Sequence, residues 1–86
     1  MKKTINYIEY SPEWGFSFLW ENGAIIKCVV EDNCVQLSAN EAGLLSLASH
    51  LVSLAQKSVP PGYHFHLDDS NSLENGSCEL IIIKDK

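Results

Sequence analysis

Basic residues are scarce in this sequence. Lysine and arginine together number six against eleven aspartates and glutamates, so the formal net charge is −5. Nucleic acids and anionic membrane surfaces both select for lysine and arginine, so we expect neither nucleic acid nor a membrane as a direct partner. The acidity favours a basic partner, although acidity that serves solubility alone gives the same composition.

Long apolar runs and an even set of cysteines are also missing. No apolar stretch approaches membrane-spanning length, and the residues after Met1 lack the apolar core of a secretory signal peptide. The three cysteines, Cys28, Cys34 and Cys78, form no C-x-x-C pair, unlike the disulfide framework of a small secreted domain. We therefore expect a cytoplasmic protein with reduced thiols.

The length and the apolar patterning predict one domain, residues 1–86, of the α+β class. We expect a mainly antiparallel sheet of about five to six strands, with one amphipathic helix packed on one face. The predicted order along the chain is β-β-β-β-α-β-β. A domain this small lies near the limit of stability, so oligomerisation would help it.

Alternating residues predict a β meander before the helix. Residues 4–10 form the first expected strand and residues 14–20 the second. The second strand places four aromatic side chains on one face: Trp14, Phe16, Phe18 and Trp20. A three-residue turn with Gly23 in the left-handed conformation opposes Phe18 to Ile26 and keeps charge off that face.

A tight turn at residues 32–33 predicts the next hairpin. It opposes Val30 to Val35 and Cys28 to Leu37, on the same face as the aromatic row. Three strands therefore agree on one apolar face, and agreement of this kind is a strong signal in a lone sequence. We expect that face to be the core.

Residues 38–57 carry a helical pattern. Ser38-x-x-Glu41 is a capping box. One half of the helix is apolar: Leu44, Leu45, Leu47, Ala48, Leu51, Val52, Leu54 and Ala55. The other half is polar: Ser46, Ser49, His50, Ser53, Gln56 and Lys57. We expect the apolar half to cover the sheet and the polar half to face away from it, and Pro60 and Pro61 to end the element.

Two strands follow the helix. Residues 63–67 alternate, with Tyr63, Phe65 and Leu67 facing inward. Residues 68–77 form a polar loop. Residues 78–84 form the last strand, which is apolar on both faces and is therefore predicted to be a central strand.

His64-x-His66 followed by Asp68 is the strongest candidate for chemistry, because two imidazoles and a carboxylate can hold a metal ion. The spacing resembles the H-x-H-x-D segment of metallo-β-lactamase-type hydrolases, a fold that needs a far longer chain. We favour two exposed imidazoles on the polar side of a strand. Cys28 and Cys78 fall in strands at the core, where a thiol acts as a small hydrophobe. We therefore predict no catalytic residue, metal, cofactor or enzymatic activity.

Two surfaces remain as candidates for partner binding. The outer sheet face is rather apolar for a solvated surface: Leu19, Ile25, Val29, His64, His66 and one of Ile81 or Ile83. The second surface is acidic and includes the polar loop of residues 68–77. That loop is interpreted equally well as a binding loop or as a simple solvated connection. We predict seven partner-binding residues: Glu31, Asp32, His64, His66, Asp68, Asp69 and Glu74.

Three segments from the helix onward are similar to a known family. Residues 40–48 (NEAGLLSLA), 62–68 (GYHFHLD) and 76–82 (GSCELII) resemble immunity protein family 32 in order and spacing. The likeness covers residues 40–84, about half of the chain. The resemblance implies a small cytosolic protein that binds and blocks a toxin of a bacterial polymorphic toxin system. It assigns no toxin-contact residue.

The leading hypothesis is a non-enzymatic immunity-type protein that neutralises a bacterial toxin domain by occlusion. The acidic charge suits a basic nuclease as the toxin, through electrostatic steering. The alternative is a small homodimeric interaction or regulatory module, joined through the outer sheet face. A third hypothesis is a small metal-binding enzyme that uses His64, His66 and Asp68.

Overall fold

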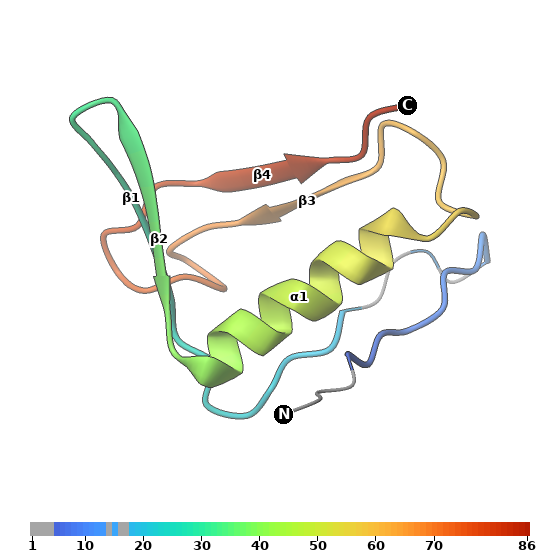
Figure 1. Cartoon of the computed structure of the whole chain (residues 1–86), viewed down its shortest axis with the longest axis horizontal. Helices are drawn as coiled ribbons and strands as arrows, with labels where there is room; N and C mark the ends of the chain where they lie inside the picture. Colours follow the sequence, from blue (N-terminus) through green and yellow to red (C-terminus); the bar gives the residue numbers. More distant parts are fainter. Residues whose placement is uncertain (1–4, 14, 16–17) are drawn as a thin grey trace.

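The computed structural model describes residues 5–13, 15 and 18–86, which form one helix and four strands. Strands β1 (Ile26–Glu31) and β2 (Cys34–Ala39) precede helix α1 (Glu41–Ala55), and strands β3 (His64–Leu67) and β4 (Leu80–Ile83) follow it. The β1–β2 hairpin stands upright at the start of α1, and β3 and β4 lie behind the helix (Figure 1).

The α+β class, the single helix and the antiparallel pairing are as predicted. A sheet of five to six strands is wrong, because the described residues form two antiparallel sheets of two strands each. The order along the described chain is β-β-α-β-β.

The β1–β2 hairpin has the predicted register. Both predicted pairs are present: Val30 with Val35, and Cys28 with Leu37. The turn residues Asp32 and Asn33 have φ angles of 52° and 62°, and left-handed backbone at both central positions matches the twist of a two-residue hairpin. Aspartate and asparagine adopt this conformation more readily than other non-glycine residues, so the local sequence determines the turn.

The second hairpin pairs β3 with β4, with Phe65 opposite Ile82. Two backbone bonds of 2.8 Å extend the ladder, from Gly62 N to Lys84 O and from Lys84 N to Tyr63 O. Phe65 is buried, as predicted, whereas Tyr63 is exposed. The prediction of a central last strand is wrong, because β3 is the only strand that pairs with β4 in the described chain.

Residues 74–78 join the two hairpins. The amide of Glu74 donates to Ile26 O and that of Cys78 donates to Cys28 O, each at 2.8 Å. The amide of Cys28 donates to Ser77 Oγ at 3.1 Å. This irregular segment occupies the edge of β1 that another strand would need, so β1 and β4 remain in separate sheets.

The N-terminal region does not form the predicted meander. Within residues 5–13 and 18–25 there is no strand, and Ser11 and Gly15 form an isolated bridge. The remaining positions of the two predicted strands, Thr4, Trp14, Phe16 and Ser17, lie outside the described residues. The predicted turn is present, since Ala24 N donates to Glu21 O at 3.2 Å and Gly23 has a φ of 82°.

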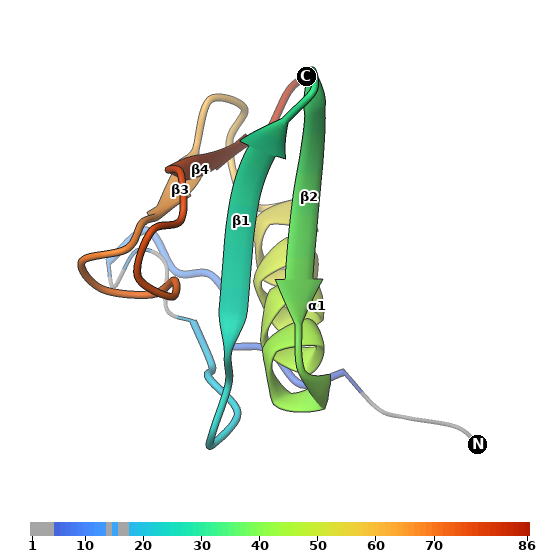
Figure 2. The same cartoon turned by 90° about the vertical axis from the view of Figure 1, so that its left-hand side faces the viewer.

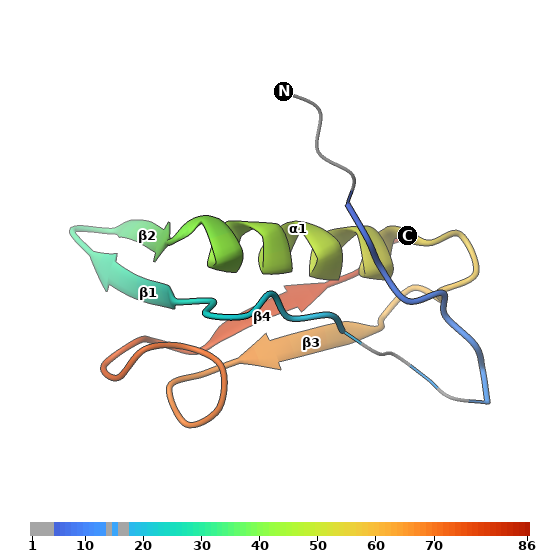
Figure 3. The same cartoon turned by 90° about the horizontal axis from the view of Figure 1, so that it is seen from below.

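The N-terminal region runs alongside α1 (Figure 3). Side chains of the helix form hydrogen bonds with the backbone groups of that region, as a neighbouring strand would. The contacts that α1 and its C-cap Gln56 make with this region include Ser49 Oγ to Asn6 O, Tyr10 N to Gln56 Oε1, His50 Nε2 to Leu19 O and Glu21 N to Ser46 Oγ. Because buried backbone groups need partners, the polar half of α1 turns toward the N-terminal segment.

The helix is therefore rotated relative to the prediction. Its buried residues are Gly43, Ser46, Leu47, Ser49, His50, Ser53 and Leu54. His50 was expected on the outward polar half and is fully buried, whereas Leu44 and Leu51 were expected in the core and are about half exposed. Gly43 permits the close approach, because a Cβ there would lie 2.5 Å from Ile25 O.

Asn40 is the N-cap of α1, so the predicted Ser38–Glu41 capping box is wrong. Asn40 Oδ1 accepts from Gly43 N at 2.8 Å and from Ile25 N at 3.0 Å. Ser38 cannot cap the helix because it still belongs to β2. Within the part of the chain that the structure describes, no helix is long and apolar enough to cross a membrane.

The core lies between α1, β3 and the lower half of β1. Its buried residues are Ile26, Cys28, Leu47, Leu54, Val59, Phe65, Leu67 and Leu73. The upper part of the hairpin rises beyond α1 (Figure 2). The prediction that Val30, Val35 and Leu37 belong to the core is wrong. They lie on the same face of the hairpin as the buried Cys28, but beyond the side chains that cover Cys28, and all three are exposed.

Candidate partner-binding surfaces

The outer face of the β3–β4 hairpin combines two histidines with two isoleucines. His64 pairs with Ile83 and His66 with Ile81, so the four side chains share one face. All four are exposed. The predicted association of His64 and His66 with isoleucine is present. Leu19, Ile25 and Val29 do not join this face, because none of them belongs to the β3–β4 sheet.

The two histidines make separate contacts. Their ring centroids are 4.9 Å apart. His66 Nδ1 lies 3.0 Å from Glu79 Oε2, and His64 Nδ1 lies 3.1 Å from Gly62 O. Among the described residues, no three His, Cys, Asp or Glu side chains are grouped so that they could hold a metal ion. The observed partners of the imidazoles thus give no support to the metal hypothesis.

Asp68 organises the loop that follows β3. Its Oδ1 accepts from Ser70 N at 3.0 Å and from Ser70 Oγ at 2.7 Å, and these bonds hold the pKa of the Asp68 carboxyl below its usual range. Its carbonyl accepts from Leu73 N at 2.8 Å, and Leu73 is buried in the core. Asp69 and Glu74 are exposed, so the fold of this loop presents their carboxylates to solvent.

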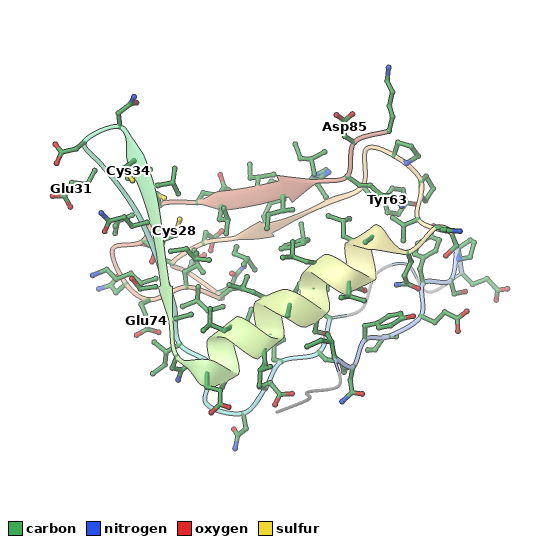
Figure 4. The ribbon with its side chains drawn as sticks, in the orientation of Figure 1. Cys28, Glu31, Cys34, Tyr63, Glu74 and Asp85 are labelled. Atoms are coloured by element: carbon green, nitrogen blue, oxygen red, sulfur yellow. The ribbon has the colours of Figure 1, made fainter. Side chains whose placement is uncertain are left out.

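The acidic hairpin turn and the acidic loop lie at the same end of the molecule (Figures 1 and 3). Glu31 is at the hairpin tip and Glu74 is lower down, nearer the hairpin base (Figure 4). Asp32 occupies the turn itself. The structure thus brings Glu31, Asp32, Asp68, Asp69 and Glu74 to one end, while His64 and His66 lie on the outer face of β3.

A set of five exposed apolar side chains was not predicted from the sequence. Its residues lie on the hairpin and on α1: Val30, Val35, Leu37, Leu44 and Leu51. Each of them is between 43% and 65% exposed, and we call this set the apolar face. The hairpin members share the face of β1 and β2 that carries the buried Cys28. Periodicity alone could not show that these residues are exposed, because it assigned all five to the core.

Cys28 and Cys78 form a thiol pair with an Sγ–Sγ distance of 3.4 Å. Burial and the neighbouring Cys78 thiol raise the pKa of Cys28, which suppresses the reactive thiolate. Cys34 is exposed at the start of β2. The pair therefore fills space in the core as an apolar group, as expected of Cys28 and Cys78.

The fold carries exposed apolar and acidic surfaces, and comparison with protein-family models places the chain in a class of immunity proteins. The matching model is Immunity protein 32, which covers residues 35–85, more than half of the chain, so the chain belongs to that family. This confirms the family that residues 40–84 resemble. Searches of curated proteins and of solved structures each gave no match.

Proposed function

We propose that this protein is a non-enzymatic immunity protein that neutralises a bacterial toxin domain by binding and covering it. Membership of the Immunity protein 32 family supports this function. The observation that carries the proposal is the apolar face, which leaves five large side chains 43% to 65% exposed on one hairpin and one helix.

A partner that covers the apolar face would gain a substantial hydrophobic free energy. Burial of apolar surface contributes roughly 25 cal/mol per Å², and a few well-packed side chains dominate most interfaces. Val35 and Leu37 lie on β2, whose outer edge has no strand partner among the described residues. A toxin can therefore contact both the side chains and the backbone of this strand.

The acidic residues extend the proposed interface beyond the apolar face. Glu31 and Asp32 directly follow Val30 at the hairpin tip, and Asp68, Asp69 and Glu74 add charge at the same end of the molecule. Such charges accelerate association with a basic partner, so we propose a basic toxin, for example a nuclease. We place the encounter in the cytoplasm, where the three thiols stay reduced.

A growth assay tests the function. A toxin domain encoded beside this gene is expressed in bacteria with and without the protein. We expect growth to be restored by the protein and not by an unrelated acidic protein of similar size. Continued growth arrest in the presence of the soluble, folded protein contradicts the proposal.

A homodimer is a second candidate, and the isoleucines on the outer face of β3–β4 favour it. Ile81 and Ile83 are exposed beside His64 and His66, and two copies could bury these rows against each other. Light scattering tests this candidate. A dimer that Ile83→Asp converts to a monomer supports it, and a monomeric native protein rules it out.

A further inference from the structure

A hollow separate from the apolar face lies between the segment before β1 and the loop after β3. It has a volume of about 300 Å³ and is lined by Trp20, Glu21, Ala24, Asn71 and Ser72. Trp20 is 44% exposed. Trp20 is one of the residues that line the hollow, so its indole provides an apolar wall for a ligand.

Both walls of the hollow are held by contacts to the rest of the fold. On one side, Trp20 packs edge-on against the buried His50 ring at 4.4 Å, and Glu21 N donates to Ser46 Oγ at 2.8 Å. On the other side, Ser72 N donates to Asp68 O at 3.0 Å. The next residue, Leu73, is buried in the core. The hollow is therefore preorganised, which lowers the entropic cost of binding.

The lining has the chemistry of a cation site. Glu21 supplies a carboxylate, and Asn71 Oδ1 is an acceptor that takes one bond from Ser72 Oγ at 2.6 Å and has a second lone pair. None of the lining residues is basic. A guanidinium group can stack on an indole and donate to a carboxylate and an amide oxygen at the same time. A lysine ammonium lacks this planar match.

We propose that this hollow binds an arginine side chain of the toxin, with the guanidinium stacked on Trp20 and paired with Glu21. This inference rests on the proposed function for the identity of the partner. The net charge of −5 favours a basic partner, and the hollow gives that general attraction a specific point of contact. The arginine acts as an anchor that fixes the orientation of the toxin on the protein.

The test uses the full chain and needs no toxin. N-acetyl-arginine amide is titrated into the isotopically labelled protein, and the NMR signals of the Trp20 indole N–H and of the Asn71 and Ser72 amides are followed. N-acetyl-citrulline amide, a neutral group of nearly the same shape, is the matched control. We expect saturable shifts with arginine, and binding of citrulline weaker by about fivefold or more. Equal binding of the two probes, or no saturable shift of the Trp20 indole, overturns the proposal.

Variants separate this site from the immunity function. Glu21→Gln keeps the size of the side chain and removes its charge, and we expect it to weaken arginine binding about fivefold. Glu13→Gln, an exposed change outside the hollow, should leave arginine binding unchanged, and an equal loss in both variants overturns the site. If the arginine probe binds but no toxin is neutralised, the proposed function fails while the site stands. If the toxin is neutralised but the probe does not bind, only the site fails.

Discussion

His50 shows how one residue can couple the helix to the rest of the fold. Its Nε2 lies 3.1 Å from Leu19 O, which requires the proton on Nε2, and the buried Nδ1 has no hydrogen-bond partner among the residues that the structure describes. The ring packs against Phe18 and Trp20, with ring-centroid distances of 4.6 Å and 4.4 Å. Burial lowers the pKa of His50 below its usual 6.5, because a charged imidazole in this apolar site loses its hydration.

Acidification should therefore destabilise the fold through His50. Above pH 6.5 neither the folded nor the unfolded state binds the proton. Below pH 6.5 the His50 imidazole binds a proton in the unfolded state but not in the folded state. The free energy of unfolding therefore falls by at most about 1.4 kcal/mol per pH unit. Urea unfolding between pH 5 and 7.5 measures this, and His50→Leu should flatten the profile. The exposed His66→Gln serves as control, and equal profiles for the native protein and His50→Leu would rule out this role.

Gly43 is the second residue with a specific structural role. In an exposed helix, glycine to alanine stabilises by about 1 kcal/mol. Here the new Cβ would lie 2.5 Å from Ile25 O and 2.9 Å from Ile26 Cγ1, and such overpacking costs roughly 1–3 kcal/mol. We expect Gly43→Ala to lower the melting temperature in circular dichroism. A neutral or higher melting temperature contradicts the close approach of α1 to β1.

At the scale of elements, hairpins were the predictable part. Asp32 and Asn33 determine the β1–β2 turn by their own backbone preferences, and the alternation on both sides then allows one register. Strands β3 and β4 were also located within a few residues of their true bounds, although their pairing with each other was not predicted. These elements depend on local preferences, which a sequence displays directly.

The helix face and the N-terminal region were not predictable in the same way. The apolar half of α1 reads as its buried half until the serines, His50 and Gln56 are seen to bond the N-terminal backbone. The buried side of the helix is therefore set by tertiary hydrogen bonds between residues 25 to 48 positions apart in the sequence. No local sequence pattern predicts such contacts. The apolar face and the hollow beside Trp20 both depend on these contacts, so the sequence could not locate them.

Two alanine variants of α1 test the observed rotation of the helix. Leu47 is buried, and Leu47→Ala should cost about 2–5 kcal/mol of stability. Leu44 is 55% exposed, and Leu44→Ala should change stability by about 0.5 kcal/mol or less. Chemical denaturation of both variants gives the comparison. Similar large losses would mean that the apolar half of the helix is the buried half after all.

At the scale of the whole molecule, the acidic hairpin turn and the acidic loop after β3 lie at the same end (Figures 1 and 3). The core is small, and a considerable share of the large apolar side chains remains exposed. A domain of this kind gains from a partner both an apolar cover and charge compensation. The predicted site residues at this end agree with such a role, and their contacts with a toxin stay a prediction.

The charge at the hairpin tip should govern how fast a basic toxin binds. We expect Glu31→Gln to lower the association rate about two- to threefold at low salt, with a smaller effect at high salt. Asp85→Asn removes the same charge far from the tip (Figure 4) and is the matched control. Stopped-flow fluorescence measures both rates, and identical rates for the two variants contradict steering by the tip.

The most direct test of the account is inhibition of the purified toxin domain by neighbouring variants of β2. Val35 lies on the apolar face and Gln36 on the opposite face of the same strand, and both are exposed. We therefore expect Val35→Asp and Gln36→Asp to fold equally well. The account predicts that Gln36→Asp inhibits like the native protein at equal molar ratio and that Val35→Asp needs about a tenfold excess or more. Full inhibition by Val35→Asp would contradict neutralisation through the apolar face.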